Sequence, residues 1–508
     1  MKKTSLILWG LILIKFILQY FLIDPVYELH RDEFLHLDQA RHLAWGFASV
    51  PPVTSWISYL IMLLGNGVFW VKFFPALFGA ITILVVWKTI EELRGNWFAL
   101  TLGAVSVLFS ALLRINTLYQ PNSLDILAWT LIYFILVKFI STEKPKWLYS
   151  AAVVFAIGFL NKYNIAFLIL GLLPAILLTE HRRLFRNKHF YYAALLELIL
   201  ISPNMVWQYQ NNFPVIHHLK ELAATQLVNV NRIDFLKEQL LFFFSSTFVI
   251  VAAMIAFVIF PSFRKFRLVG WSFLITILLF AWFRAKSYYA IGLYPILLVF
   301  GAVYLEQLLN KKWGRYLRPI VLTIPILLFF PMFKVAFPNH TPKEIRQNAQ
   351  MYQDFGLLKW EDGNDHALPQ DFADMLGWKE LVCKVDSAYT QISDPDHTLI
   401  YCDNYGQAGA INYYSKVKNI GAVSLNADYI NWFKLNREIR HVIRVKEIDD
   451  NGKELIVSQP YFDSVVRFDE ITNEFARERG TTIYLLIKSK VNVNEILQRE
   501  IDERKKHQ

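Results

Sequence analysis

The feature that most constrains the fold of this chain is a series of long apolar segments. They recur through the first two thirds of the sequence and end near Lys334. An α-helix needs about 20 apolar residues to cross the hydrocarbon core of a membrane, which is about 30 Å thick. We therefore predict a polytopic α-helical membrane protein of about 11 spans. The expected spans lie at residues 6–23, 67–87, 98–113, 122–140, 147–161, 164–179, 190–206, 241–260, 268–283, 288–308 and 316–334.

The sequence becomes polar and mixed from Asn339 onward. We therefore predict two domains: a transmembrane domain over residues 1–338, with an outer loop at 24–65, and a soluble α/β domain over residues 339–508. Within the loop, the brief apolar segment 53–64 is expected to lie along the membrane interface. In the soluble domain we expect helices at 369–389 and 493–506 and strands at 398–402, 441–446, 454–458 and 481–487.

The charge distribution indicates how the spans are oriented. Residues 339–508 hold 22 Lys and Arg against 27 Asp and Glu, so the remaining 30 basic and 15 acidic residues give the first 338 residues a net charge of +15. This excess lies in short loops such as 181–188, 263–267 and 311–315, which is typical of cytoplasmic loops and not of a nucleic-acid-binding face. With a cytoplasmic N-terminus, about 11 spans place the soluble domain outside the cytoplasm.

Two cysteines, Cys383 and Cys402, both lie in the polar part of the chain. In an oxidising compartment they are able to pair, and otherwise they are two buried thiols. The sequence leaves both alternatives open.

The outer loop that follows the first span carries an unusual group of charges. Residues 27–36 combine acids, histidines and an arginine beside an apolar segment, and charges so close to hydrocarbon generally face a functional cavity. A helix over residues 31–46 would place Asp32, His36 and Gln39 on one face. Asp32 is then a candidate general base, or else Asp32 and Glu33 only cap the start of an interfacial helix.

A second group of polar residues lies at other outer span ends. Asp125 sits a few residues inside an apolar segment, so it either pairs with a base such as Arg114 or lines the same cavity as Asp32. Lys162 and Lys286 run against the positive-inside trend, which phosphate binding would explain, whereas Lys72 is better explained by snorkelling. The stretch 203–218 mixes aromatics with amides, as sugar-binding surfaces and interfacial belts both do.

Taken in order, these motifs resemble the integral-membrane glycosyltransferases of the protein O-mannosyltransferase and aminoarabinose transferase group, which have the GT-C fold. The resemblance spans nearly the whole chain. The matching segments are residues 30–33, 41–46 with Pro51 and Pro52, 120–125, 158–163, 203–208 and 286–289, together with 373–378 and 404–410 in the polar part. One departure is Val50, because relatives often carry a polar or basic residue just before the two prolines.

The resemblance implies a polyprenyl-phosphate sugar as donor and an inverting transfer at the outer face of a bacterial inner membrane. It implies that Asp32 and Asp125 are the two acidic positions and that Lys162 and Lys286 hold phosphate. We expect Asp32 to lie close to these lysines. The full set of candidates comprises Asp32, Glu33 and Asp125 as catalytic residues and Arg31, His36, Arg114, Gln120, Lys162, Tyr163, Lys286, Tyr288 and Tyr289 as substrate-binding residues.

Since the lysines can carry the phosphate charge, this scheme requires no cofactor or metal, although it does not exclude a divalent metal. The acceptor is a protein hydroxyl, lipid A or another glycan or lipid, and no nucleic acid is expected as a partner. The alternative function is a transporter or flippase of lipid-linked sugar in which the acids relay protons. A third alternative, a non-catalytic scaffold, leaves the outer acids and lysines unexplained.

Overall fold

The computed structural model describes residues 3–225, 227–311, 313–417 and 420–507. The chain forms two compact units. Unit 1 comprises Met1–Leu22, Val50–Thr54 and Phe69–Phe337, and unit 2 comprises Ile23–Ser49, Ser55–Val68 and Pro338–Gln508. Most of the expected outer loop therefore belongs to the same unit as the polar C-terminal part of the chain. The assignment of domains at residues 1–338 and 339–508 stays a prediction.

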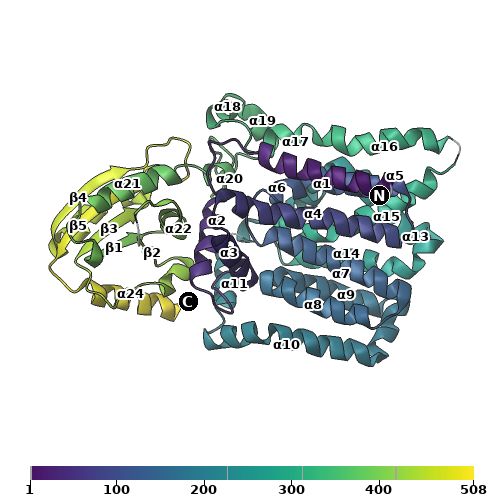
Figure 1. Cartoon of the computed structure of the whole chain (residues 1–508), viewed down its shortest axis with the longest axis horizontal. Helices are drawn as coiled ribbons and strands as arrows, with labels where there is room; N and C mark the ends of the chain where they lie inside the picture. The colour runs from purple at the N-terminus through teal and green to yellow at the C-terminus, as the bar shows by residue number, and fades with distance from the viewer. Residues whose placement is uncertain (1–2, 226, 312, 418–419, 508) are drawn as a thin grey trace. The chain divides into compact units, whose positions relative to one another are not determined.

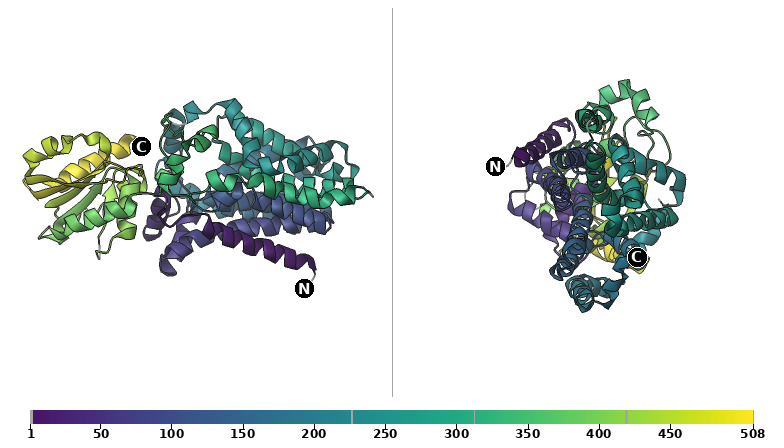
Figure 2. Two further views of the ribbon diagram at one scale, coloured as in Figure 1. Left: turned by 90° about the horizontal axis from the view of Figure 1, so that it is seen from above. Right: turned by 90° about the vertical axis from the view of Figure 1, so that its right-hand side faces the viewer.

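Unit 1 is a bundle of long apolar helices that run side by side (Figures 1 and 2). In the described part of the chain, seven helical segments are long and apolar enough to cross a membrane, or nine if each of two bent pairs is one span. The protein is thus a multi-pass membrane protein. Four of the seven segments fall on single helices: α1 (Lys3–Phe21), α4 (Val68–Glu92), α7 (Asn122–Thr142) and α10 (Lys188–Gln210). The other three are Pro261–Trp282, which ends in α14 (Arg267–Trp282), Ser287–Leu308, which ends in α15 (Tyr294–Leu308), and Gly314–Val335, which contains α16 (Gly314–Phe329) and α17 (Met332–Val335).

The bent pairs account for two further spans that the sequence predicts. One joins Tyr163–Leu177, which contains α9 (Ala166–Leu177), to Glu180–Arg186 at an angle of 107°. The other joins α12 (Arg232–Phe242) to Phe244–Ile259, which ends in α13 (Thr247–Ile259), at 64°. Two remaining predicted spans fall on shorter apolar helices, α5 (Trp97–Leu108) and α8 (Lys146–Asn161). The predicted interfacial segment forms α3 (Val53–Leu63).

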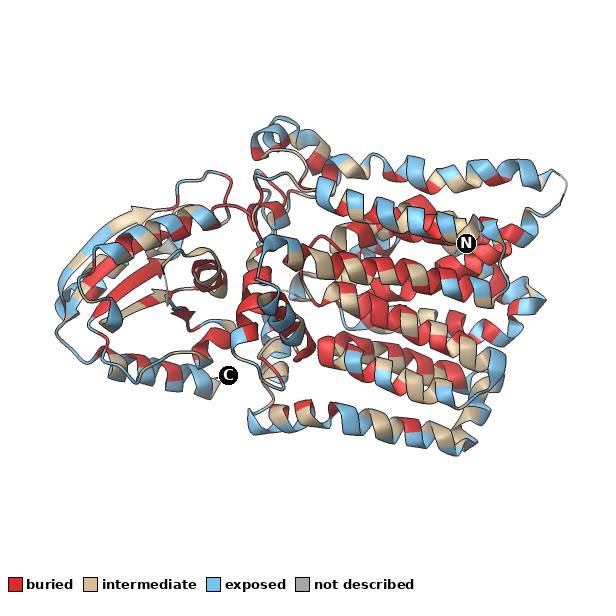
Figure 3. Ribbon diagram, viewed as in Figure 1, coloured by how far each residue is buried: buried red, intermediate tan, exposed pale blue. Residues whose placement is uncertain are grey.

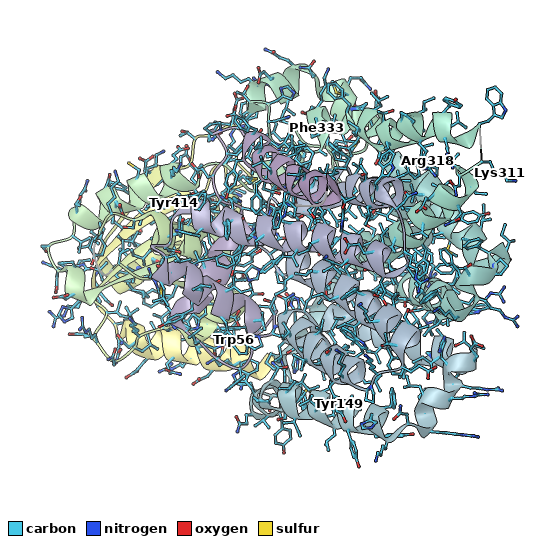
Figure 4. The ribbon with its side chains drawn as sticks, turned by 45° about the vertical axis from the view of Figure 1, so that its right-hand side comes forward. Trp56, Tyr149, Lys311, Arg318, Phe333 and Tyr414 are labelled. Carbon is cyan, nitrogen blue, oxygen red and sulfur yellow. The ribbon has the colours of Figure 1, made fainter. Side chains whose placement is uncertain are left out.

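The core of unit 1 lies around α7 and α15, whereas α10 and α16 expose most of their side chains (Figure 3). Small residues allow the central helices to approach closely. A Cβ atom added at Gly301 of α15 would lie 1.9 Å from the backbone oxygen of Val249 in α13, so this position requires glycine. Along the exposed helix α16, Figure 4 shows Arg318 near one end, and Phe333 lies beyond the other end in α17.

Unit 2 contains a five-stranded mixed sheet in the order β2-β1-β3-β5-β4. β1 (Thr398–Cys402) pairs in parallel with β2 (Ala422–Ser424) and β3 (His441–Lys446), while β5 (Thr482–Ser489) runs antiparallel to β3 and to β4 (Phe462–Glu470). The closing helix α24 (Val493–His507) buries Leu497 and Ile501. The predictions of an α/β fold, of strands at β1, β3 and β5, and of the closing helix are confirmed.

Two local predictions in unit 2 are wrong. Residues 454–458 were expected to form a strand but belong to helix α23 (Lys453–Ser458), because Asn451 and Gly452 form a left-handed turn and the Asp450 carboxylate accepts the N–H of Glu454. The expected helix at 369–389 is interrupted at Gly377, whose φ of +86° favours glycine. It is divided into α20 (Gln370–Ala373) and α21 (Trp378–Thr390). In addition, the sequence pattern did not indicate strands β2 and β4.

The two cysteines do not form a disulfide. Both are free thiols; Cys402 is buried in β1, and Cys383 is exposed on α21. Burial raises the pKa of the Cys402 thiol well above its usual range. Of the two alternatives that the sequence left open, pairing is contradicted, and only one of the two thiols is buried.

The helix predicted over residues 31–46 is shorter than expected. Helix α2 covers Arg31–Asp38, and one turn of 3-10 helix continues it to Arg41. Long-range contacts then determine the path of the chain, because the Asp38 carboxylate accepts hydrogen bonds from Asn412 at 2.6 Å and from Tyr429 at 2.7 Å. Local periodicity contains no information about such partners.

Helix α2 packs closely against α22 (Tyr405–Tyr414), and a glycine makes this possible. A Cβ atom at Gly409 would lie 2.6 Å from both the Cβ of Phe34 and the hydroxyl of Tyr429. We expect Gly409→Ala to destabilise the protein by about 1–3 kcal/mol through overpacking, although alanine favours helices. A melting temperature several degrees below that of the wild type in detergent would support this. Gly421→Ala is the matched control, because nothing lies within 4 Å of its added Cβ, and an unchanged melting temperature for Gly409→Ala would contradict the prediction.

Candidate functional site

The first group of candidate residues lies at the start of α2, in unit 2. His30 is the N-cap of this helix: its Nδ1 accepts the backbone N–H of Asp32 at 3.2 Å, and the Glu33 carboxylate accepts the backbone N–H of His30 at 2.8 Å. This reciprocal arrangement is a capping box, which satisfies backbone donors that have no partner within the helix. The capping alternative therefore accounts for the buried Glu33, whose catalytic role stays a prediction.

The Asp32 carboxylate is not part of the capping box, which His30 and Glu33 form. Its Oδ1 accepts a hydrogen bond of 2.6 Å from the Tyr405 hydroxyl, and 36% of its side chain is exposed. Burial by itself would raise the pKa of Asp32, but the neighbouring His30 and Arg31 and the Tyr405 hydrogen bond together hold it below its usual range. The group is therefore an ionised carboxylate near neutral pH, as a general base must be.

Further charged groups surround this carboxylate. The Arg31 guanidinium lies 4.7 Å from the centre of the Tyr405 ring, and His30 Nε2 lies 3.7 Å from Asp374, a carboxylate that also accepts Arg477 at 3.1 Å. His36 is buried with its Nδ1 3.4 Å from Gln39 Oε1, and this burial lowers the pKa of His36. The structure thus brings Arg31, Asp32, Glu33 and His36 together in one polar cluster of unit 2.

The second group of candidates lies in unit 1, where α7 begins and α8 ends. Lys162 follows α8 directly and donates to the side-chain oxygen of Asn122 at 2.7 Å. Its ammonium lies 5.1 Å and 4.4 Å from the ring centres of Tyr288 and Tyr289. An ammonium held by aromatic faces and an amide oxygen is well placed to bind an anion through charge-assisted hydrogen bonds.

Asp125 is the acidic member of this group. It accepts one hydrogen bond from Trp129 and another from Asn164, both at 3.0 Å, and the charge of Lys162 acts on it. Arg114, the partner suggested by the sequence, donates to Thr117 at 2.6 Å. A buried carboxylate within a span thus has donors that satisfy it and a cation nearby, as intramembrane charges require.

The remaining candidates of unit 1 are linked to the same group. Gln120 accepts a hydrogen bond from Asn122 at 2.9 Å, and the charge of Lys286 acts on Lys162. The Tyr163 hydroxyl donates to Asn204 at 3.0 Å and accepts from Gln208 at 2.9 Å, which connects the aromatic and amide stretch of α10 to the group. That Asp32 lies close to Lys162 and Lys286 stays a prediction.

Sequence reasoning overlooked three residues that the structure connects to these groups. Asn122 binds Lys162, Asn164 links Asp125 to the backbone oxygen of Tyr289, and Tyr405 binds Asp32. Asn164 lies two residues after Lys162 at a span end, and Asn122 lies in the matching segment 120–125, so both positions had a signal in the sequence. Tyr405 lies in the matching segment 404–410, but the sequence did not indicate its partner Asp32, which is 373 residues away.

Comparison with known proteins identifies the fold of the chain. Residues 49–207 match the family model described as dolichyl-phosphate-mannose-protein mannosyltransferase. Along 95% of its length the chain is similar to ArnT from Cupriavidus metallidurans in the crystal structure bound to undecaprenyl phosphate, with a TM-score of 0.63, 13% identity and 98% of that chain covered. The chain has the GT-C fold. The apo structure of the same ArnT gives a TM-score of 0.62 and 12% identity over 95% of this chain and 98% of that one.

No curated protein matches the sequence. The GT-C fold confirms the architecture that the sequence motifs predicted. The segment that matches the family model contains Asp125 and Lys162, whereas Asp32, Lys286 and the tyrosine pair lie outside it. Among the residues that the structure describes, no three His, Cys, Asp or Glu side chains group as metal ligands would.

Proposed function

We propose that the protein is an inverting glycosyltransferase that moves a sugar from a polyprenyl phosphate to an acceptor at the outer face of a bacterial inner membrane. The observation that carries this proposal is the group around Lys162. Lys162 and its partner Asn122 lie in the segment that matches the mannosyltransferase family model, within a chain that has the GT-C fold. ArnT, solved with undecaprenyl phosphate, supports a lipid phosphate as the donor class.

To unit 1 we assign the donor phosphate. Lys162 donates to the amide oxygen of Asn122, which a phosphate oxygen can replace. Lys286 adds a second positive charge nearby. Two cations neutralise the phosphate both as it is bound and as it becomes the leaving group, so the scheme needs no metal.

To unit 2 we assign the base. The Asp32 carboxylate takes the proton of the acceptor hydroxyl while that oxygen attacks the anomeric carbon from the face opposite the phosphate. The bond between the anomeric carbon and the phosphate oxygen breaks, and its electron pair leaves with the polyprenyl phosphate. Attack from the opposite face inverts the anomeric configuration, and the transition state resembles an oxocarbenium ion.

The proposal is tested with the purified full-length protein in detergent. It is mixed with undecaprenyl-phosphate-linked hexoses and with membrane extract from a strain that lacks the gene, and mass spectrometry follows both the release of undecaprenyl phosphate and the appearance of glycosylated product. We expect both with one donor sugar. Movement of fluorescent lipid-linked sugar across liposomes with no glycosylated product would instead establish a flippase.

A further inference from the structure

We infer that Tyr405, from the sheet-containing C-terminal part of unit 2, is a positioning residue for the catalytic carboxylate. The polar part of the chain then completes the active site and is not merely a cover or a docking module. This inference rests on the proposed function of Asp32 as the base, and it adds a residue and a role that the sequence motifs do not assign.

The hydrogen bond itself is the first argument. At 2.6 Å, the Tyr405 hydroxyl donates to Oδ1 of Asp32, a distance typical of strong bonds to ionised acceptors. A carboxylate held at one oxygen has a fixed plane, which directs its second oxygen. Oδ2, which lies 3.9 Å from His30 Nδ1, is the oxygen that we assign to the acceptor proton.

The second argument is that Tyr405 is itself rigidly held. It is the first residue of α22, which directly follows the carboxyl end of β1 and is closed by a capping box between Asn404 and Gln407. Asn404 also donates to Glu447 at 2.8 Å and to Glu478 at 3.1 Å. The Arg31 guanidinium also lies over the ring of Tyr405.

The third argument is the place of this contact in the sheet topology. β1 lies between the parallel strands β2 and β3, and the chain crosses to opposite sides of β1 to reach them. The carboxyl ends of parallel strands at such a reversal usually form a ligand crevice. Here the start of α2 approaches this edge, because a Cβ added at Gly406 would lie 3.3 Å from the Cβ of Arg31. The chain's own catalytic loop thus lies where α/β sheets commonly bind ligands.

The titratable and charged groups around Asp32 determine the expected pH dependence. His30, Arg31 and His36 act on it from its own segment, and Tyr405 and Asp374 act from the C-terminal part. Burial and the adjacent Asp32 raise the pKa of Tyr405 well above its usual range, so the phenol remains a donor. Its hydrogen bond favours the ionised carboxylate, so removing it raises the pKa of Asp32 and reduces the fraction of active base at acidic pH.

The experiment compares Tyr405→Phe with the wild type by steady-state kinetics across pH. We expect kcat to fall about 10- to 100-fold, the effect of losing one hydrogen bond to a charged group, with the KM for the lipid donor unchanged and the acid limb of the profile moved to higher pH. Tyr413→Phe is the matched control: this tyrosine is on the same helix, but its hydroxyl donates to the backbone oxygen of Asn66 at 2.8 Å.

A second measurement keeps the inference testable if Tyr405→Phe folds poorly. Incorporating 3-fluorotyrosine at position 405 retains the ring and makes the hydroxyl a stronger donor, so the acid limb should move to lower pH. An unchanged kcat and an unchanged acid limb in both proteins would overturn the inference. Asp32→Asn tells the two failures apart: if it is inactive while Tyr405→Phe behaves as wild type, only the role of Tyr405 is wrong, and if it remains active, the proposed base is wrong.

Discussion

Asp32→Asn is expected to transfer sugar about 100- to 10,000-fold more slowly than the wild type, because an amide cannot take the acceptor proton and general-base catalysis contributes about 10²–10⁴-fold. The substitution preserves shape, and the amide oxygen still accepts the hydrogen bond that Tyr405 gives to Oδ1. The fold and the binding of undecaprenyl phosphate should therefore remain unchanged. Initial rates with a lipid-linked sugar donor, together with a melting curve, provide the measurement.

The matched control for this variant is Asp371→Asn. Asp371 belongs to the same unit and lies 4.0 Å from His30, but 58% of its side chain is exposed and the proposed chemistry does not use it. We expect this variant to keep nearly full activity. If Asp32→Asn transfers sugar within tenfold of the wild-type rate, the base lies elsewhere.

Lys162→Met is expected to weaken the binding of undecaprenyl phosphate about 10- to 100-fold, the effect of losing a charge-assisted hydrogen bond to phosphate. Methionine keeps much of the length and the apolar stem of lysine but carries no charge. Binding of radiolabelled undecaprenyl phosphate to the detergent-solubilised protein measures the effect. Undecaprenol, which lacks the phosphate, should bind equally to both proteins, because only the headgroup contact is lost.

Lys237→Met serves as the control for a general effect of charge. Lys237 is also a lysine of unit 1, but it is exposed and pairs with Asp234 at 3.0 Å, so its loss should leave phosphate binding unchanged. Equal affinities of Lys162→Met and wild type for undecaprenyl phosphate would remove the group around Lys162 from the donor site. Since Asp32→Asn should leave the affinity for undecaprenyl phosphate unchanged and Lys162→Met should lower it, the binding measurement tells the base and the phosphate site apart.

Much of the fold was predictable because its signals are local. A membrane accepts only segments whose backbone groups are satisfied internally, so length and hydropathy alone indicate a span such as α4 or α15. Strands β1, β3 and β5 were also predictable from local signals, because each has a short apolar pattern. The strand expected at 454–458 failed because a turn at Asn451 and Gly452 begins a helix there, and this turn outweighs an apolar pattern that strands and helices share.

For the candidate residues, too, local signals were predictable and long-range partners were not. The sequence by itself determined that unpaired acids and lysines at span ends need partners, because charge near hydrocarbon is costly. Only the tertiary structure decided what those partners are: Asn122 for Lys162, 40 residues away, and Tyr405 for Asp32, 373 residues away. Hydropathy is a property of neighbouring residues, whereas a hydrogen bond between two distant side chains depends on the path of all the chain between them.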